Sequence, residues 1–362
     1  MKIASILENK KIEKRIAITP EIAKKYISLG LEVSLPENYG SHLGIKDEEY
    51  KELGVTISKD EKEIISNADI IVQLGLLNDD KSSLIKENQT FIGVLNPYDN
   101  KDKINDLVKK NINTFSLELL PRITRAQSMD ILSSQANLAG YKAVVESFTH
   151  FEKAIPMMMT AAGTIPAAKV LVVGAGVAGL QAIATAKRMG AIVFATDVRM
   201  ASKEQVESLG GKFLTVEGAE NLETEGGYAK EASDDFKEKQ EALLSETLKK
   251  IDIVICTALI PGKKAPVIVK EGMINNMSSG SVIYDLAAIQ GGNTALTKVD
   301  EIVDCNGVKI IGESNILNKL PNSASNLYSK NVFNFVSNLY DKENNKININ
   351  LEDEIIEKTL IK

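Results

Sequence analysis

Residues 171–197 read LVVGAGVAGLQAIATAKRMGAIVFATD, and this stretch decides the fold. An apolar run enters Gly174, Gly176 and Gly179, a helix-forming stretch follows, and a second apolar run ends at Asp197. A strand, a glycine turn, a helix and a strand in this order predict a βαβ unit that binds a dinucleotide. Gly174 permits the tight turn, Gly176 lets the backbone approach a pyrophosphate, and Gly179 lets the helix pack on the strand.

The same unit indicates how the nucleotide is held. The N-terminus of the predicted helix offers unbonded N–H groups and a partial positive charge to the phosphates. The candidate contacts in the turn are Gly174, Ala175, Gly176, Val177, Ala178 and Gly179. Asp197 is placed to accept hydrogen bonds from the adenosine ribose, and its charge would repel a 2′-phosphate, which favours NAD(H) over NADP(H). Val198 and Arg199 follow directly and complete this set.

Composition sets the broad class. A chain of 362 residues suggests two domains, and 44% hydrophobic with 25% charged residues is typical of a soluble globular protein. The net charge of -6, without a long basic stretch, argues against a nucleic-acid partner. No apolar run approaches the roughly 18 residues of a membrane span, and the N-terminus lacks the apolar centre of a signal peptide. Cys256 and Cys305 lack metal-ligand spacing, so we expect reduced thiols, a cytoplasmic protein and no metal site.

Strand and helix patterns alternate along both halves of the chain, which predicts parallel sheets with helices on both faces. The first half predicts strands at residues 2–7, 31–35, 70–74, 90–95 and 113–116, with helices at 20–29, 47–53 and 102–110. The second half adds to the βαβ unit strands at residues 212–214, 252–256, 281–285 and 309–311. A charged, glycine-broken stretch at 217–240 predicts a mobile excursion.

A continuous helical pattern at 126–150 predicts a long helix that connects the two halves. Residues 323–340 predict an amphipathic helix that returns to the first half, and 347–351 a short strand. The predicted class is therefore α/β, with two Rossmann-like, doubly wound parallel-sheet domains joined by a long helix and a ligand cleft between them. The expected domains are 1–125 plus 320–362, which is discontinuous, and 126–319, which binds NAD(H).

Six blocks of sequence carry a resemblance to a known family. They read KRIAITP at 14–20, RAQSMDILSSQANLAGY at 125–141, PMMMTAAG at 156–163, KEQVESLGG at 203–211, GGYAKE at 226–231 and TALIPG at 257–262. Together with the glycine turn, they make the chain similar to the alanine dehydrogenase/pyridine nucleotide transhydrogenase family. Within it, the chain most resembles the NAD(H)-binding domain I of the alpha subunit of proton-translocating transhydrogenases.

The resemblance implies roles for four polar residues near the start of the linking helix. In the family, residues at the positions of Arg122, Asp130 and Ser133 hold the nicotinamide end of the nucleotide; Arg122 and Asp130 resemble an ion pair, and Asp130 with Ser133 would hold the carboxamide. Gln127 would lie beside the nicotinamide and the ribose of the opposing nucleotide. On residue chemistry alone, the alternative is a surface ion pair and a solvated glutamine.

Two loops complete the expected site. Gly227 and Tyr228 resemble the hinge and the aromatic residue of a flap near the adenosine, although Tyr228 could instead be a plain aromatic anchor. Thr257, Ala258 and Leu259 follow a predicted strand, so they are candidate nucleotide contacts at the carboxyl edge of the sheet. Residues 288–290 read AIQ, where the family usually carries an acid, so we expect no acidic role there, and Asp285 could be only a capping group.

Missing residues favour one of the family's two chemistries. The dehydrogenases supply a Lys in a segment like 70–77 and a His in one like 90–99, and neither segment of this chain contains that residue. Arg15 is retained where the dehydrogenases bind the substrate carboxylate, but without these partners we expect a structural remnant. His42 and His150, the only histidines, are expected to be structural or solvated. Hydride transfer between two nicotinamides needs no such acid or base, only alignment and exclusion of water.

The resemblance therefore implies a peripheral enzyme component. NADH bound here would pass hydride to NADP+ on an NADP(H)-binding beta subunit, coupled to proton translocation through a membrane-spanning subunit. The chain would be a homodimer on the cytoplasmic face of the inner membrane, with its membrane and NADP(H)-binding portions on separate polypeptides. The alternatives are a stand-alone amino-acid dehydrogenase of the alanine dehydrogenase type and a non-catalytic NAD-sensing or scaffold protein.

Overall fold

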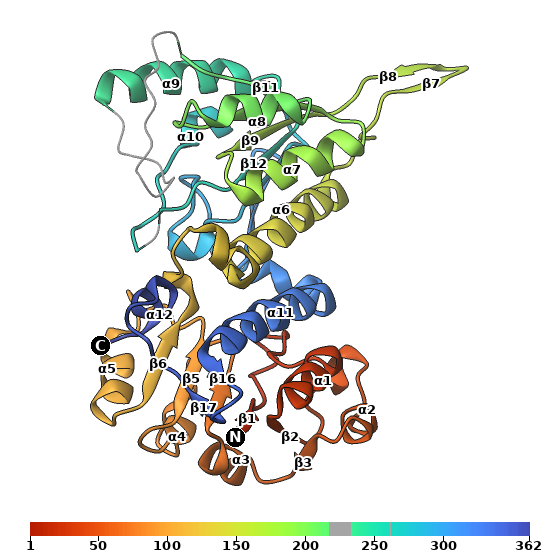
Figure 1. Cartoon of the computed structure of the whole chain (residues 1–362). Coiled ribbons are helices and arrows are strands. Elements are labelled where there is room, and N and C mark those ends of the chain that lie inside the picture. Colours follow the sequence, from red (N-terminus) through yellow and green to blue (C-terminus); the bar gives the residue numbers. More distant parts are fainter. Residues whose placement is uncertain (217–232, 261) are drawn as a thin grey trace. The chain divides into compact units, whose positions relative to one another are not determined.

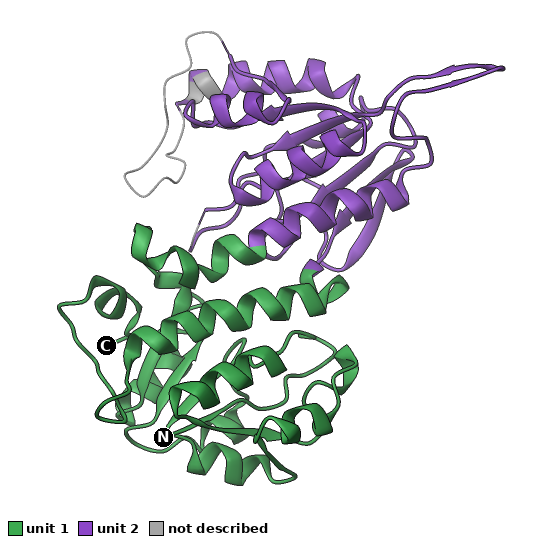
Figure 2. Ribbon diagram, turned by 45° about the vertical axis from the view of Figure 1, so that its right-hand side comes forward, with its two compact units in different colours: residues 1–135, 317–362 green, residues 136–316 purple. Residues whose placement is uncertain are grey.

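The computed structural model describes residues 1–216, 233–260 and 262–362 (Figure 1). The chain divides into two compact units, Met1–Gln135 with Leu317–Lys362, and Ala136–Ile316 (Figure 2). These bounds differ from those expected at 125/126 and 319/320, because the first division falls inside helix α6 (Ile131–His150) rather than before it.

Unit 1, made from both ends of the chain, is built on a six-stranded sheet in which every neighbouring pair is parallel. Its spatial order is β3 (Thr56–Ser58), β2 (Glu32–Pro36), β1 (Lys2–Ala4), β4 (Ile70–Val72), β5 (Thr90–Gly93) and β6 (Asn113–Ser116). The strand order reverses between β1 and β4, so this is a doubly wound sheet.

Helices cover both faces of this sheet, because successive strand residues point to opposite sides. On one face, Ile3 and its neighbours pack with α1 (Pro20–Leu29) and α11 (Pro321–Leu339). On the other, Ala4 and its neighbours pack with α3 (Glu61–Asn67) and α5 (Lys101–Lys109). The smaller elements are η1 (Ser41–Leu43), α2 (Asp47–Glu52), α4 (Asp79–Ser82), η2 (Leu117–Leu119), η3 (Thr124–Met129), η5 (Ile316–Lys319), β16 (Tyr340–Asp341), β17 (Lys346–Ile347) and α12 (Glu354–Thr359).

Unit 2 is built on a seven-stranded sheet that is parallel except at one edge, where β14 pairs antiparallel with β15. Its order is β11 (Lys212–Phe213), β10 (Ile192–Thr196), β9 (Lys169–Val173), β12 (Ile253–Cys256), β13 (Val282–Asp285), β15 (Val308–Gly312) and β14 (Glu301–Cys305). The chain reverses direction across the sheet between β9 and β12. The predicted class, with two doubly wound, mainly parallel sheets, is therefore confirmed.

The helices of unit 2 cover a sheet that is buried on both faces. Leu171 and Val173 of β9 belong to a core with α9 (Asp234–Leu248) and α10 (Glu271–Ile274). α7 (Val177–Arg188) packs on β9, β10 and β12. Gly140 of α6 lies so close to α7 that an added Cβ would be 2.0 Å from the carbonyl oxygen of Ala178. The remaining elements are the hairpin β7 (Met158–Thr160) and β8 (Gly163–Ile165), α8 (Ser202–Ser208) and η4 (Ala288–Gln290).

Three local expectations need correction. The helix predicted at 126–150 is interrupted: η3 ends at Met129, Asp130 is extended with ψ 93, and α6 starts at Ile131. The excursion predicted at 217–240 includes the start of α9 from Asp234, and its residues 217–232 lie outside the described residues. The strand predicted at 347–351 is instead β17, paired with β16. Within the described ranges, no helix is long and apolar enough to cross a membrane.

Candidate nucleotide-binding site

The glycine turn between β9 and α7 has the geometry that its sequence predicts. Gly174 has φ +94, in the left-handed region that favours glycine. A Cβ on Gly179 would lie 1.9 Å from the Gly174 carbonyl oxygen, so this residue must be glycine for the helix to sit on the turn. A Cβ on Gly176 would have only an Arg199 nitrogen within 4 Å, at 3.9 Å, so the backbone there faces open space.

The N-terminus of α7 is available to an anion. Gly176 is its N-cap residue and supplies no side-chain hydrogen bond to the first turn. The first N–H groups of an α-helix have no partner within the helix, so those following Gly176 point toward the open side of the turn. A bare glycine turn and an uncapped helix of this kind fit the pyrophosphate of a dinucleotide.

Asp197 is held by the turn and by its own neighbour. Its Oδ2 accepts from the N–H of Ala175 at 2.7 Å and from Nη2 of Arg199 at 2.7 Å. Its Oδ1 accepts from the backbone N–H and Nε of Arg199, at 2.8 and 2.9 Å. Burial raises the pKa of Asp197, but the bonds from Arg199 and Ala175 outweigh it, so the pKa is below its ordinary value.

This arrangement changes what the acid can do. A carboxylate offers about four lone-pair positions, and those of Asp197 are used within the protein. A ribose hydroxyl must therefore replace a guanidinium bond in order to reach Asp197. Arg199 also balances the charge that was expected to repel a 2′-phosphate, so the acid alone does not establish the preference for NAD(H). Val198 lies between the two.

The loop after β12 lies against the glycine turn. The hydroxyl of Thr257 donates to the carbonyl oxygens of Val173 and Gly174, at 3.2 and 2.9 Å. A Cβ on Gly174 would lie 3.1 Å from the nitrogen of Ala258. Leu259 is exposed. The structure thus places all three predicted loop contacts beside the turn, at the carboxyl edge of the sheet.

The predicted nicotinamide residues belong to unit 1 and lie around η3 and the start of α6. Arg122 is exposed between η2 and η3, and Gln127 is exposed on η3. The carboxylate of Asp130 accepts from the N–H and hydroxyl of Ser133 at 2.9 and 2.5 Å, so Asp130 caps α6. The pairing of Arg122 with Asp130 stays a prediction, as does the cleft between domains. Gly227 and Tyr228 lie outside the described residues.

The segment resembling the dehydrogenase substrate site is occupied by its own side chains. Glu13 accepts from Nε and Nη2 of Arg15 at 2.8 and 2.7 Å, and Gln135 accepts from Nη1 at 2.8 Å. At the end of β4, Gln73 bonds to Ser5, at 2.6 Å, and to the backbone of Ile6. The guanidinium that could bind a carboxylate is therefore already paired, as expected of a structural remnant.

Glu8 is a titratable group that the sequence did not single out. It follows β1, is partly buried, and accepts from Gln73 Nε2 at 2.9 Å and from the N–H of Leu74 at 3.1 Å. Burial raises its pKa to about 7, although the bond from Leu74 acts in the opposite direction. Charged residues surround Glu8 in the sequence, so no pattern distinguishes it from them; its burial arises from packing between β1 and β4.

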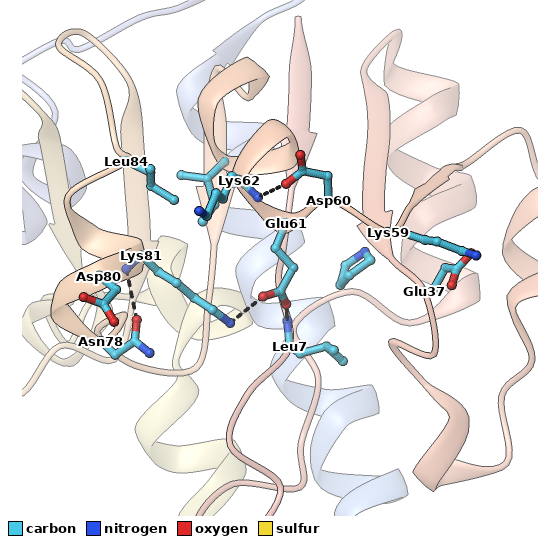
Figure 3. A pocket seen from close by; sticks show the side chains of 12 residues that line it. Leu7, Glu37, Lys59, Asp60, Glu61, Lys62, Asn78, Asp80, Lys81 and Leu84 are labelled. Atoms are coloured by element: carbon cyan, nitrogen blue, oxygen red, sulfur yellow. Dashed lines mark hydrogen bonds and ion pairs between the residues drawn. The ribbon is translucent and has the colours of Figure 1, made fainter.

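A cavity of about 570 Å³ opens in unit 1 at the carboxyl ends of its strands (Figure 3). Its charges pair with each other: Lys81 with Glu61 at 2.6 Å and Lys59 with Glu37 at 3.9 Å. Asp60 caps α3. Among the described residues, none predicted to bind nucleotide lines this cavity, so we assign it no role in the site.

Comparison with known proteins adds the relatives. The family model of the alanine dehydrogenase/PNT N-terminal domain matches residues 6–139, and that of the C-terminal domain matches 143–362. A protein of Rickettsia prowazekii, named as the first of the separate polypeptides of NAD(P) transhydrogenase subunit alpha, is 50% identical over 100% of this chain and 94% of its own length. The Rhodospirillum rubrum protein of the same name is 48% identical over 100% and 96%. A crystal structure of transhydrogenase from Sinorhizobium meliloti matches with a TM-score of 0.90 at 41% identity, over 99% of this chain and 98% of that one.

Proposed function

This chain belongs to the alanine dehydrogenase/PNT family, and from that premise we propose that it is the NAD(H)-binding component of a proton-translocating NAD(P) transhydrogenase. The observation that carries the proposal is the full-length likeness to relatives named as transhydrogenase alpha subunits. The glycine turn, the uncapped start of α7 and the bonded Asp197 support NAD(H) as the nucleotide.

When bound, the nicotinamide supplies the chemistry: a C4–H bond of NADH breaks, its hydride forms a C4–H bond on NADP+, and NAD+ and NADPH result. The chain's residues bind and align. The turn at 174–179, with Asp197, Val198 and Arg199, would hold the adenosine and pyrophosphate, and the loop 257–259 would border them. Asp130 and Ser133 would hold the carboxamide, with Arg122 and Gln127 beside the ring. Alignment of this kind lowers a barrier without a proton donor.

The same proposal names the partners. Hydride would pass to NADP+ on an NADP(H)-binding beta subunit, and a membrane-spanning subunit would couple the transfer to proton translocation. The chain would act as a homodimer, peripheral on the cytoplasmic face of the inner membrane. Gly227 and Tyr228 would close over the adenosine side.

Mixing the purified protein with the NADP(H)-binding subunit tests the proposal. We expect NADH, or an analogue distinguishable by absorbance, to reduce NADP+. A folded mixture without transfer would contradict the proposal. NADH oxidation with pyruvate and ammonium, without any partner, would instead indicate the stand-alone dehydrogenase. Tight NADH binding without transfer to any acceptor would indicate a sensing protein.

Gln127 offers a sharper arm of the same experiment. Because it would align the two nucleotides rather than bind one, Gln127→Asn should slow hydride transfer at least tenfold and change the NADH dissociation constant less than threefold, as expected for an interaction made only in the aligned complex. Equal losses in both quantities would remove this role from Gln127.

A further inference from the structure

Asn293, which follows β13 and η4, is a fully buried residue whose side chain bonds only to backbone. Its Oδ1 accepts from the N–H of Ala258 at 3.0 Å. Its Nδ2 donates to the carbonyl oxygens of Ala258 at 2.8 Å and of Pro266 at 2.9 Å. A carboxamide has two amide hydrogens and one oxygen, and all of them are used. No other side chain of this size supplies both kinds of bond to Ala258.

Asn293 is in turn fixed by a buried carboxylate. Oδ2 of Asp285 accepts from the N–H of Asn293 at 2.7 Å and from the Thr297 hydroxyl at 2.6 Å, and Oδ1 accepts from the N–H of Ala287 at 2.9 Å. A Cβ on Gly292, which has φ +82, would lie 2.9 Å from that Oδ2. Asp285 is thus more than a cap on one group: it holds the backbone that presents the Asn293 side chain.

The backbone held by Asn293 belongs to the predicted nucleotide site. Ala258 lies beside Gly174, and the preceding Thr257 bonds to the same turn. Asp197 follows β10 and Ala258 follows β12, on opposite sides of β9 and its glycine turn. A dinucleotide crosses such a sheet edge from one side of the turn to the other. With the adenosine toward Asp197, Ala258 is on the nicotinamide side.

We infer that Asn293 is a positioning residue that holds the Ala258 backbone at the nicotinamide side of the dinucleotide. The inference rests on the proposed NAD(H) site and adds to it a residue that touches no nucleotide. It predicts that loss of the Asn293 carboxamide weakens binding of the whole dinucleotide much more than binding of its adenosine half.

The test compares Asn293→Ala with wild type by isothermal titration calorimetry, using NADH and ADP as ligands. We expect the dissociation constant for NADH to rise at least tenfold and that for ADP to change less than threefold. Gln89→Ala is the matched control. Gln89 of unit 1 is also buried, and its carboxamide also bonds only to backbone, at Lys86, Ile65 and Ala68. It should lower the melting temperature and leave both dissociation constants unchanged.

NADH binding by Asn293→Ala within twofold of wild type would overturn the inference, and so would equal losses for NADH and ADP, which would mean general damage to unit 2. Wild type that folds but binds no NADH would overturn the proposed function, and the inference with it. Should the alanine variant not fold, Asn293→Asp keeps the size and the acceptor but has no donor when ionised. Its NADH affinity, relative to wild type, should improve as the pH falls and the carboxyl regains a hydrogen; an unchanged ratio would contradict the role.

Discussion

Replacing Glu8 with glutamine should make the protein more stable at high pH. The carboxyl has a pKa of 4.5 in its ordinary environment and about 7 in the folded protein, so the folded state binds this proton more tightly than the unfolded state does. The stability contributed by protonated Glu8 is complete below pH 4.5 and is lost as the pH rises to about 7. A rise from 4.5 to about 7 corresponds to roughly 3 kcal/mol, an upper figure because the side chain is only partly buried.

Glutamine keeps an oxygen that can accept from Gln73 and from the Leu74 N–H, and it carries no charge. At about pH 8 we expect Glu8→Gln to raise the free energy of unfolding by about 1–3 kcal/mol, and at about pH 4.5 to change it by less than about 0.5 kcal/mol. Urea denaturation followed by far-ultraviolet circular dichroism measures both, and suits a chain without tryptophan. Glu63→Gln, at an exposed carboxylate of α3, is the control and should show no such difference.

A stability difference between wild type and Glu8→Gln that is equal at the two pH values would refute this reasoning, because the effect would then come from the shape of the side chain. A variant less stable than wild type at about pH 8 would refute it as well. That result would mean that ionised Glu8 is stabilised by its neighbours more than it is destabilised by burial.

Three further changes test the site. Gly179→Ala would place a Cβ 1.9 Å from the Gly174 oxygen, so NADH affinity should fall at least tenfold and the melting temperature should drop; binding unchanged by calorimetry would show that the turn can shift. Asp197→Ala should weaken NADH binding and narrow the ratio of NADPH to NADH dissociation constants; an unchanged ratio would assign the preference elsewhere. Asp130→Ala should cost about 1 kcal/mol in urea unfolding, and Asp130→Asn less, because either oxygen can cap α6; equal costs would exclude capping as the reason.

Local pattern was sufficient for the sheets and the glycine turn. Apolar runs with period-two burial define the strands, and the positions of Gly174 and Gly179 admit no side chain, so the sequence itself carries the constraint. The interruption at Asp130 was harder to predict, because the helical pattern continues across it. Only the bonds from Ser133 show that the aspartate caps a new helix.

Properties that depend on several elements were beyond the sequence. The pattern identified Asp197 but not its bonds to Arg199, which depend on the path of the chain after β10. Glu8 owes its raised pKa to the approach of β4, and Asn293 owes its role to a loop that precedes it by about 35 residues. Such contacts are set by tertiary packing, which spacing alone does not reveal.

The clamp of Glu13 on Arg15 has a consequence for how the two branches of the family could interconvert. Restoring a lysine at the end of β4 and a histidine after β5 would still leave the guanidinium bonded to a carboxylate from its own chain. A small 2-oxo acid would have to compete with a tethered group whose local concentration greatly exceeds its own. Drift at position 13, rather than at position 15, is therefore the substitution that would first reopen this region of unit 1 to a carboxylate from solution.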